Sequence, residues 1–246
     1  SAFEELALER LHFEVEQAKK EVPAPGEDAV GREFAGLEDD VRSFVRMVRK
    51  EGAPWEELEF GFGMGGETPV SIEVEGGSIQ LRGMIDRLDC PGGDLELEGI
   101  RVIDYKTGRN TRDFREGTGV FNGGRRLQLG LYALAVEERL SRPVETGEYH
   151  YPTRGGQNEL FSFERNELEG IGSLVGHMLQ GGAEGRFIPT QDKEDCSYCD
   201  YSAVCRVEKS DYGAVISSPL AEWSEKHLEH PALTPLKEVR EFEDEG

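Results

Sequence analysis

Two runs of alternating apolar and polar residues constrain the fold of this 246-residue chain more than any other feature. They are GMIDRLD at residues 83–89 and RVIDYKTG at residues 101–108, and residues 90–94 between them are CPGGD. The sequence Pro-Gly-Gly-Asp favours a turn, because proline fixes one φ angle and glycine adopts positive φ angles at little cost. We therefore predict that the two runs form an antiparallel β-hairpin.

The second run carries a candidate catalytic pair, Asp104 and Lys106. Residues two apart on a strand share one face and lie about 6–7 Å apart along it. Asp86 lies on the neighbouring strand, so two carboxylates and one ammonium group are expected close together. Two carboxylates can bind a hard divalent cation, and a lysine can orient or deprotonate water or stabilise charge on a phosphate. The alternative is a surface Asp–Lys ion pair, which is common.

Three further polar residues are candidates for the same site. Glu59 lies in a predicted strand, where its simplest interpretation is a carboxylate that faces solvent. Gln128 and Tyr132 are four residues apart, so they stack on one face of a predicted helix. By spacing alone they are a polar residue at a helix boundary and a tyrosine at the edge of the core.

The hydrophobic periodicity predicts helices, strands, a helix, strands and a helix in that order. This order favours an α/β fold in which a central mixed sheet has helices on both sides. Loops are expected at residues 22–31, which contain two prolines, and at residues 109–124, which are polar and rich in glycine. The predicted helices are residues 1–21, 33–50, 126–140 and 166–180, and the further predicted strands are residues 58–62, 70–74, 79–86, 148–151 and 160–163.

The net charge of −22 argues against a generic nucleic-acid binder, because such proteins neutralise phosphates with basic residues. The charge is unevenly distributed, however. Residues 206–246 hold ten acidic and five basic side chains, whereas residues 101–126 hold seven basic and three acidic ones. We call residues 101–126 the basic strip, and we expect that it can hold a phosphodiester on an otherwise acidic body. A salty habitat would also explain the acidity.

Three of the four cysteines, Cys196, Cys199 and Cys205, lie within ten residues. This cluster suits metal ligation better than a disulfide framework, because the chain has no secretion signal. No stretch approaches 18 consecutive apolar residues, so no membrane span is expected. We expect a cytoplasmic protein and, because the chain does not begin with methionine, a segment of a longer one.

Three segments in order, GMIDRLD, RVIDYKTG and LQLGLYALAVE, closely resemble the signature of PD-(D/E)XK nucleases of the RecB/AddB type. That family also carries a glutamate upstream, in a stretch resembling L-E-x-x-F-G. In the segment LEFGFG this place is taken by Glu59, with Glu57 as a nearby competitor. The resemblance extends over roughly residues 55–206, and the other matching residues are Asp86, Asp104, Lys106, Gln128 and Tyr132.

The resemblance implies a restriction-endonuclease-like core and a metal-dependent DNA nuclease. The expected substrate is DNA, with single-stranded ends favoured, in DNA repair or recombination, and the expected partner is a helicase domain or subunit. The resemblance assigns binding of Mg²⁺ or Mn²⁺ to Glu59, Asp86 and Asp104.

The remaining matches have other implied roles. Lys106 would assist the attacking water, and Gln128 and Tyr132 would position the DNA backbone or the catalytic groups. The main alternative function is a non-catalytic DNA-binding or assembly module of a helicase–nuclease complex. A zinc-stabilised protein-interaction domain is a third interpretation, but it leaves the Asp–Asp–Lys pattern unexplained.

Many nucleases of this family carry a cysteine trio that binds a 4Fe–4S cluster together with one cysteine far upstream. Cys196, Cys199 and Cys205 resemble that trio, down to the arginine that follows the last cysteine. The resemblance places the upstream cysteine, and a metal-binding histidine of the family, before residue 1. We interpret Cys90 as a turn residue rather than as the fourth ligand.

The chain therefore divides into three expected parts. Residues 1–54 are an N-terminal helical region, and residues 55–206 are the nuclease core with the cysteine cluster. Residues 207–246 are an acidic tail, much of which we expect to be extended or disordered.

Overall fold

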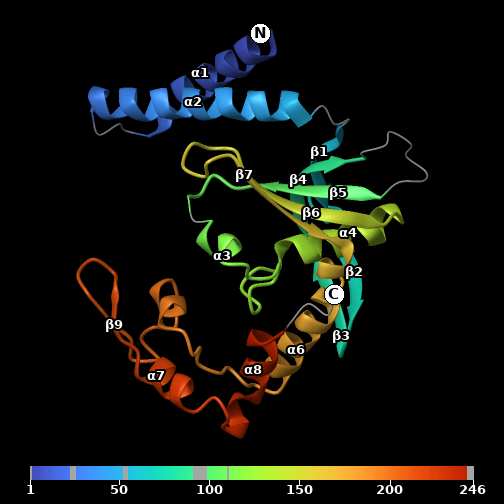
Figure 1. Ribbon diagram of the computed structural model, residues 1–246, viewed down its shortest axis with the longest axis vertical. Helices are drawn as coiled ribbons and strands as arrows, with labels where there is room; N and C mark the ends of the chain where they lie inside the picture. Colours follow the sequence, from blue (N-terminus) through green and yellow to red (C-terminus); the bar gives the residue numbers. More distant parts are fainter. Residues whose placement is uncertain (1, 23–25, 52–54, 91–98, 110, 243–246) are drawn as a thin grey trace.

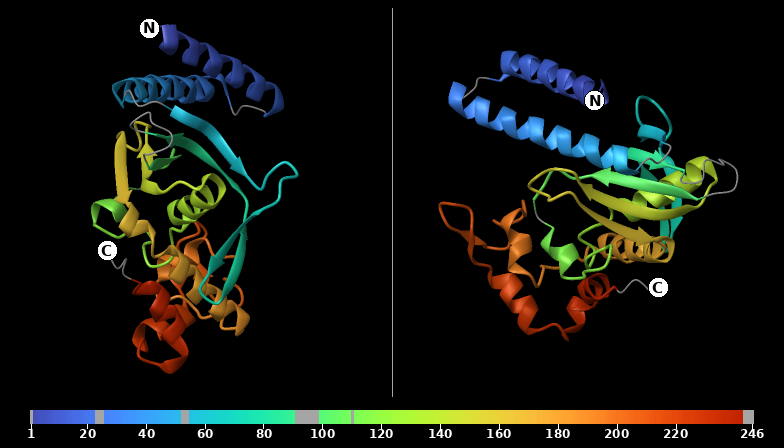
Figure 2. Two further views of the ribbon diagram at one scale, coloured as in Figure 1. Left: turned by 90° about the vertical axis from the view of Figure 1, so that its right-hand side faces the viewer. Right: turned by 45° about the horizontal axis from the view of Figure 1, so that its top comes forward.

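A computed structural model describes residues 2–22, 26–51, 55–90, 99–109 and 111–242 of the protein. Two N-terminal helices lie at one end of the molecule, a mixed sheet with its covering helices lies in the middle, and the C-terminal segments curve around the other end (Figure 1). The two further views in Figure 2 show the same order.

A five-stranded sheet forms the centre of the protein, in the order β1-β4-β5-β6-β7. Its strands are β1 (Trp55–Phe62), β4 (Gly83–Asp89), β5 (Ile100–Tyr105), β6 (Val144–Tyr151) and β7 (Glu159–Glu164). β4 pairs antiparallel with both β1 and β5, β5 pairs parallel with β6, and β6 pairs antiparallel with β7. The sheet is therefore mixed and has helices on both sides, which confirms the predicted fold class.

The predicted hairpin of the two alternating runs is confirmed. β4 and β5 pair antiparallel, with Arg87 opposite Ile103. The predicted turn residues 91–94 lie outside the described residues. β1 begins at Trp55, before the predicted strand at residues 58–62.

A second hairpin, β2 (Val70–Val74) and β3 (Gly77–Leu81), forms a separate two-stranded sheet. The prediction of one strand over residues 79–86 was therefore wrong, because β3 pairs with β2 whereas β4 joins the main sheet. Gly83 permits this change of sheet, since a Cβ atom there would lie 2.8 Å from the ring of Phe62.

The helices α1 (Ala2–Glu21) and α2 (Glu27–Glu51) pack against each other at the N-terminal end. α2 begins earlier than the predicted helix at residues 33–50, which shortens the predicted loop. The ring of Phe44 on α2 meets the ring of Tyr105 on β5 edge-on at 5.2 Å, and this contact joins α2 to the sheet. No helix in the described parts of the chain is long and apolar enough to cross a membrane.

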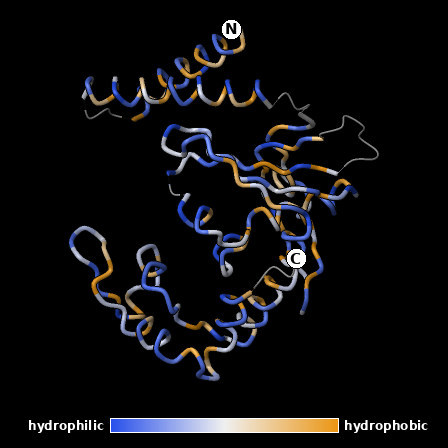
Figure 3. Tube along the Cα trace, in the orientation of Figure 1, coloured by the Kyte–Doolittle hydropathy of each residue, from blue (hydrophilic) through white to orange (hydrophobic). Residues whose placement is uncertain are grey.

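The other face of the sheet is covered by α4 (Gln128–Leu140), which contacts β5, β6 and the β2–β3 hairpin. Apolar side chains of these elements form one core. Hydrophobic positions follow the central strands along the trace (Figure 3). Gly130 allows α4 to pack closely, because a Cβ atom there would lie 2.7 Å from Ile171 Cβ and 2.8 Å from the ring of Phe121.

The predicted helix at residues 166–180 is two helices, α5 (Arg165–Leu168) and α6 (Ile171–Ala183). The break lies at Gly170, where a Cβ atom would come within 2.9 Å of the Phe242 ring. α6 also continues through the glycine pair that was expected to end it.

Charged side chains are buried on the face of the sheet beneath α2. The guanidinium group of Arg87 donates two hydrogen bonds of 2.6 Å to the carboxylate of Asp89, and Arg101 donates a third of 2.6 Å. Arg87 also donates to the hydroxyl of Tyr105 at 3.1 Å. Burial opposes the charge of Arg87, but its hydrogen bonds to Asp89 and Tyr105 outweigh that effect and raise the pKa of Arg87.

The segment predicted as a loop at residues 109–124 contains one short helix, α3 (Arg112–Arg115). The described part of the acidic tail also has regular structure, so the expectation that it is largely extended or disordered was wrong. The C-terminal elements are η1 (Lys193–Ser197), β8 (Glu208–Lys209), β9 (Val215–Ser217), α7 (Pro219–Lys226), η2 (Pro231–Leu233) and α8 (Thr234–Arg240).

The tail is ordered by contacts with the core. α8 packs against α6, and Arg240 at its end donates hydrogen bonds to the Gly123 carbonyl at 2.6 Å and to Asp195 at 3.0 Å. The ring of Phe242 lies 6.2 Å from that of Phe121. These apolar and charged contacts offset the self-repulsion of the acidic segment.

The close approach of α4 to α6 gives a test of the packing. We expect Gly130→Ala to lower stability by about 1–3 kcal/mol, because its methyl group would overlap Ile171 and Phe121. Gly172→Ala on α6 is the control, since a Cβ atom there meets nothing within 4 Å, and it should gain roughly 0.5–1 kcal/mol from helix propensity. Urea denaturation of both variants measures the difference. A Gly130→Ala protein as stable as the wild type would contradict the packing of α4 described above.

Candidate functional site

The register of the sheet brings three predicted carboxylates to one level on neighbouring strands. Asp104 on β5 lies next to Tyr149 on β6. Extending the β4–β5 pairing by one position places Asp86 opposite Asp104. Glu59 falls opposite Asp86, between two pairs of the β1–β4 ladder. Because side chains directly across neighbouring strands are adjacent, the three residues mark one region of the sheet.

A continuous chain of polar contacts runs from β5 to α4 at this level. Lys106 Nζ lies 2.6 Å from Asp104 Oδ2 and donates a 2.6 Å hydrogen bond to Gln128 Oε1. Gln128 Nε2 in turn donates to the hydroxyl of Tyr132 at 2.7 Å, and that hydroxyl donates to the Met84 carbonyl at 2.9 Å. The structure thus brings four of the predicted site residues together.

The local sequence explains how each of these groups is positioned. Lys106 follows the last residue of β5, and its backbone N–H still donates to the His150 carbonyl at 2.8 Å, which extends the parallel pairing with β6. Gln128 is the first residue of α4 and Tyr132 lies one turn later. The i, i+4 spacing therefore presents both polar groups to the end of β5.

Asp86 and Glu59 are the two predicted site residues outside this series of hydrogen bonds. Asp86 is half-buried, and its Oδ2 accepts a 2.7 Å hydrogen bond from the backbone N–H of Tyr105. Glu59 is exposed and has a φ angle of +53°, in the left-handed region that costs a non-glycine residue about 1–2 kcal/mol. The ladder of β1 with β4 continues on both sides of it. Such local strain often marks a functional position.

Two groups of the site have shifted pKa values. Burial raises the pKa of the Asp104 carboxyl, the hydrogen bond and charge of Lys106 oppose this shift, and the nearby charge of Asp86 adds to it. Burial also raises the pKa of Tyr132, with contributions from the charges of Asp104 and Asp86. Two carboxylates that lie close together and are partly buried repel each other, which lowers the stability of the fold. Such groups with shifted pKa values are frequent at functional sites.

The described residues contain no group of three or more His, Cys, Asp or Glu side chains placed to hold a metal ion. Asp86 is directed to a backbone amide, and Glu59 is exposed. The chemistry of the site nevertheless fits a hard divalent cation. Asp104 Oδ2 is buried and, apart from its ion pair with Lys106, accepts no hydrogen bond within the described structure. Carboxylate oxygens are the ligands that such cations prefer.

Sequence reasoning did not identify Tyr149, Phe114 and Arg126, which surround the same site. Lys106 Nζ lies 5.4 Å from the centre of the Tyr149 ring, and the Arg126 guanidinium lies 3.9 Å over the ring of Phe114. The Phe114 ring in turn lies 5.4 Å from that of Tyr149. No spacing rule could have paired Tyr149 with Asp104, because their neighbourhood depends on the parallel register of β5 with β6.

The basic strip is less positive in the structure than its composition suggested. Arg101 is paired with Asp89 and Glu148, Arg115 lies 2.8 Å from a carboxylate oxygen of Glu159, and Arg125 lies 2.8 Å from one of Asp195. Lys106 is paired with Asp104. These residues of the strip therefore join elements of the protein, and binding of a phosphodiester by the rest of the strip stays a prediction.

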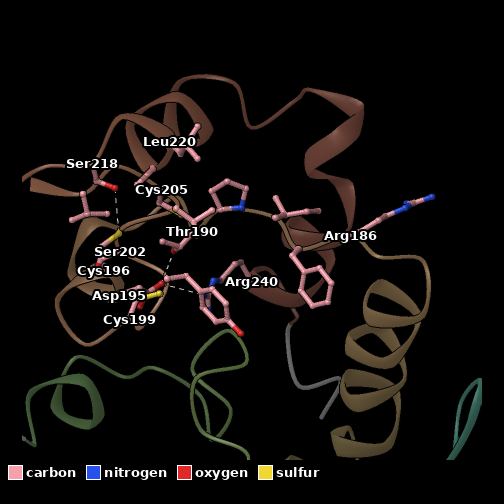
Figure 4. Close-up of a pocket in the computed structure, with 17 residues that line it drawn as sticks. Arg186, Thr190, Asp195, Cys196, Cys199, Ser202, Cys205, Ser218, Leu220 and Arg240 are labelled. Atoms are coloured by element: carbon pink, nitrogen blue, oxygen red, sulfur yellow. Dashed lines mark hydrogen bonds and ion pairs between the residues drawn. The ribbon is translucent and has the colours of Figure 1, made fainter.

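The predicted cysteine trio is brought to one cavity of about 660 Å³ in the C-terminal part (Figure 4). Cys196 is buried, with its Sγ 3.3 Å from Ser218 Oγ, and Cys199 and Cys205 are half-buried. Cys90 does not line this cavity; Arg142 Nη2 lies 3.1 Å from its Sγ. The three thiols share a cavity but do not form a preassembled ligand set.

The raised pKa of Asp104 predicts a pH-dependent cost in stability. The folded protein holds this proton more tightly than the unfolded chain does, so stability falls as the pH rises from the ordinary carboxyl range, about 4, through the raised pKa. The Asp104→Asn side chain cannot ionise, so the stability of this variant relative to the wild type should rise as the pH increases through this range. Loss of the ion pair with Lys106 adds a change in stability that does not vary with pH over the same range. Thermal denaturation in EDTA at several pH values between about 4 and 8 measures it.

The control is Asp211→Asn, at an exposed carboxylate between β8 and β9. A stability difference for Asp104→Asn that does not change with pH, or that the control reproduces, would contradict the desolvation of Asp104.

Comparisons with known proteins identify the family of the chain. Residues 2–206 match the PD-(D/E)XK nuclease superfamily. An ATP-dependent helicase/deoxyribonuclease subunit of Symbiobacterium thermophilum is 47% identical over 83 residues, which are 33% of this chain and 7% of that protein. Gene 69 protein of Mycobacterium phage D29 is 29% identical over 167 residues, which are 66% of this chain and 51% of that protein. The chain spans less than two thirds of each relative. By its match over most of its length, the chain belongs to the PD-(D/E)XK nuclease superfamily.

Proposed function

We propose that this chain is a metal-dependent DNA nuclease of the RecB/AddB type, which hydrolyses phosphodiester bonds at single-stranded DNA ends. One observation carries the proposal, namely the hydrogen-bonded chain from Asp104 through Lys106 and Gln128 to Tyr132. Membership of the superfamily supports a nuclease. The name of the Symbiobacterium relative, a helicase/deoxyribonuclease subunit, supports action on DNA beside a helicase. A role in DNA repair or recombination is part of the proposal and follows from the resemblance to the RecB/AddB type.

Asp104 and Asp86 are proposed to hold the divalent cation, Mg²⁺ or Mn²⁺, with Glu59 as the third ligand. When bound, the cation would neutralise charge on the phosphate and lower the pKa of a water molecule. The left-handed backbone at Glu59 favours this residue over the neighbouring Glu57, because strain at one position indicates a requirement on its direction.

Lys106 is proposed to bind the reacting phosphate or the attacking water. Its ammonium group has three N–H donors. One is directed to Asp104 and one to Gln128, so the third remains for substrate. Gln128 and Tyr132 are positioning residues, because they hold Lys106 in place and connect it to the backbone of β4.

The cysteine trio is proposed to bind an iron–sulfur cluster of the 4Fe–4S type. The support is that Cys196, Cys199 and Cys205 line one cavity and that thiolates suit iron. The fourth ligand would come from outside the residues described here. When bound, the cluster would cross-link the segment that contains the trio.

Lys106→Ala tests the nuclease proposal. We expect wild-type protein with Mg²⁺ or Mn²⁺ to cut 5′-labelled single-stranded DNA, and the variant to lose at least about 10²-fold in rate, because charge stabilisation at the phosphate is removed. Lys226→Ala on α7 is the matched control and should cut normally. The absence of cutting by wild type would favour the non-catalytic DNA-binding module. Cutting that survives Lys106→Ala would exclude this lysine from the site.

The cluster proposal has a separate test. Protein purified without oxygen should be brown and contain iron and sulfide, and Cys199→Ser should lose both because one thiolate ligand is missing. Cys90→Ser is the control and should keep the colour. Colourless wild-type protein that contains zinc would instead support a structural zinc site, and colourless metal-free protein would contradict any metal at the trio.

A further inference from the structure

A small polar cavity of about 300 Å³ lies just beyond the end of β5. It begins one residue after Lys106 and is closed on the other side by the turn between β6 and β7. It is lined by Asp40, Thr107, Arg109, Thr153, Arg154 and Gly155.

Arg109 differs from several other arginines of the basic strip in its contacts. It makes no hydrogen bond or ion pair with any residue that the structure describes, whereas Arg101, Arg115 and Arg125 are paired with carboxylates. Asp40 lines the same cavity but is bonded to Arg154. An exposed guanidinium group with five N–H donors and no ion pair among the described residues is suited to bind an anion.

Gly155 determines where the Arg109 side chain lies. A Cβ atom on Gly155 would come within 2.7 Å of Arg109 Cγ and 3.1 Å of its Nε. The φ angle of Gly155 is not positive, so the backbone does not require glycine there. The missing side chain instead makes room for the stem of Arg109 at the wall of the cavity.

Arg154, the other arginine of the cavity, is already bonded to carboxylates. Arg154 Nη1 donates to Asp39 at 3.1 Å, and the Arg154 backbone N–H donates to Asp40 Oδ1 at 2.8 Å. Arg154 also lies 3.5 Å from Asp40 Oδ1, so it is bonded to both aspartates. Arg109 is then the charged group of the lining that has no partner among the described residues. The Thr153 hydroxyl accepts a 3.0 Å hydrogen bond from the Gly156 N–H, and a hydroxyl that accepts in this way still has its own O–H to donate.

We propose that this cavity binds a backbone phosphate of the substrate strand, with Arg109 as the binding residue, next to the phosphodiester that Lys106 faces. The proposal rests on the proposed nuclease function. Three residues of chain span at most about 11 Å, so Arg109 and Lys106 can contact phosphates of one short strand. Bidentate hydrogen bonds from Arg109 and a hydroxyl donor would hold the phosphate oxygens. Such a contact fixes the strand in the site without reading its sequence.

The test is the salt dependence of binding of a labelled oligo(dT) strand in EDTA, where no cleavage takes place. Loss of one phosphate contact should lower the slope of log K against log[salt] by about 0.7 for single-stranded DNA. We expect this change for Arg109→Ala, with weaker binding at low salt. Arg32→Ala on α2 removes the same charge at an exposed position and should leave the slope unchanged. An unchanged slope for Arg109→Ala would overturn the proposal.

Gly155→Ala provides an independent variant, because it displaces the Arg109 stem without removing its charge. It should weaken binding as Arg109→Ala does, while retaining a wild-type melting temperature within a few degrees. Equal binding by Gly155→Ala and wild type would contradict the placement of the side chain.

Single methylphosphonate substitutions along the strand identify the phosphate. One neutral position should weaken wild-type binding but have no further effect on Arg109→Ala, because both changes remove the same contact. Additive effects at every position would overturn the assignment. These outcomes are separate from those of the nuclease test. Wild type that cuts DNA while Arg109→Ala binds normally refutes only this inference, whereas absence of both cutting and binding refutes the proposed function itself.

Discussion

The parallel pairing of β5 with β6 is the constraint on which the site depends. Two parallel neighbouring strands need a crossover, and here the crossover contains α4. The crossover begins at Lys106, directly after β5, and α4 within it carries Gln128 and Tyr132. The crossover therefore brings these two side chains into the series of hydrogen bonds that starts at Lys106. The same pairing places Tyr149 beside Asp104 and gives the backbone of Lys106 its last strand-like hydrogen bond.

The two faces of the β4–β5 hairpin carry different groups of charged side chains. On the α4 side, Asp86 and Asp104 stand together at a cost in desolvation. On the α2 side, Asp89 is enclosed by Arg87 and Arg101, and Arg101 also lies 3.6 Å from Glu148, so that two arginines face two carboxylates. A one-residue slip of register would exchange the two faces and bury the wrong charges on each. We therefore expect the buried network to favour the observed register, which places Asp86 beside Asp104.

Local rules account for the pairs of polar residues in this site, whereas their assignment to one site came from the resemblance to a family. Asp104 and Lys106 could be paired by the two-residue repeat of a strand, and Gln128 and Tyr132 by the repeat of a helix, because both rules need only near neighbours. What failed depended on distant contacts. The described tail, for example, is ordered through Arg240 and Phe242 against segments more than a hundred residues earlier. Composition likewise overstated the basic strip, because it counts charges without the carboxylates that meet them in space.

The junction at Asp195 links the stability of distant parts of the chain. Its carboxylate accepts hydrogen bonds from Arg125, just before α4, and from Arg240 at the end of α8. It is adjacent to Cys196 in the sequence. Local opening of the C-terminal segment would leave Arg125 without its partner and loosen the segment that leads into α4. We therefore expect amide hydrogens at the start of α4 to share an opening free energy with the C-terminal segment, so that the hydrogen bonds from Lys106 to Tyr132 depend partly on residues far from them.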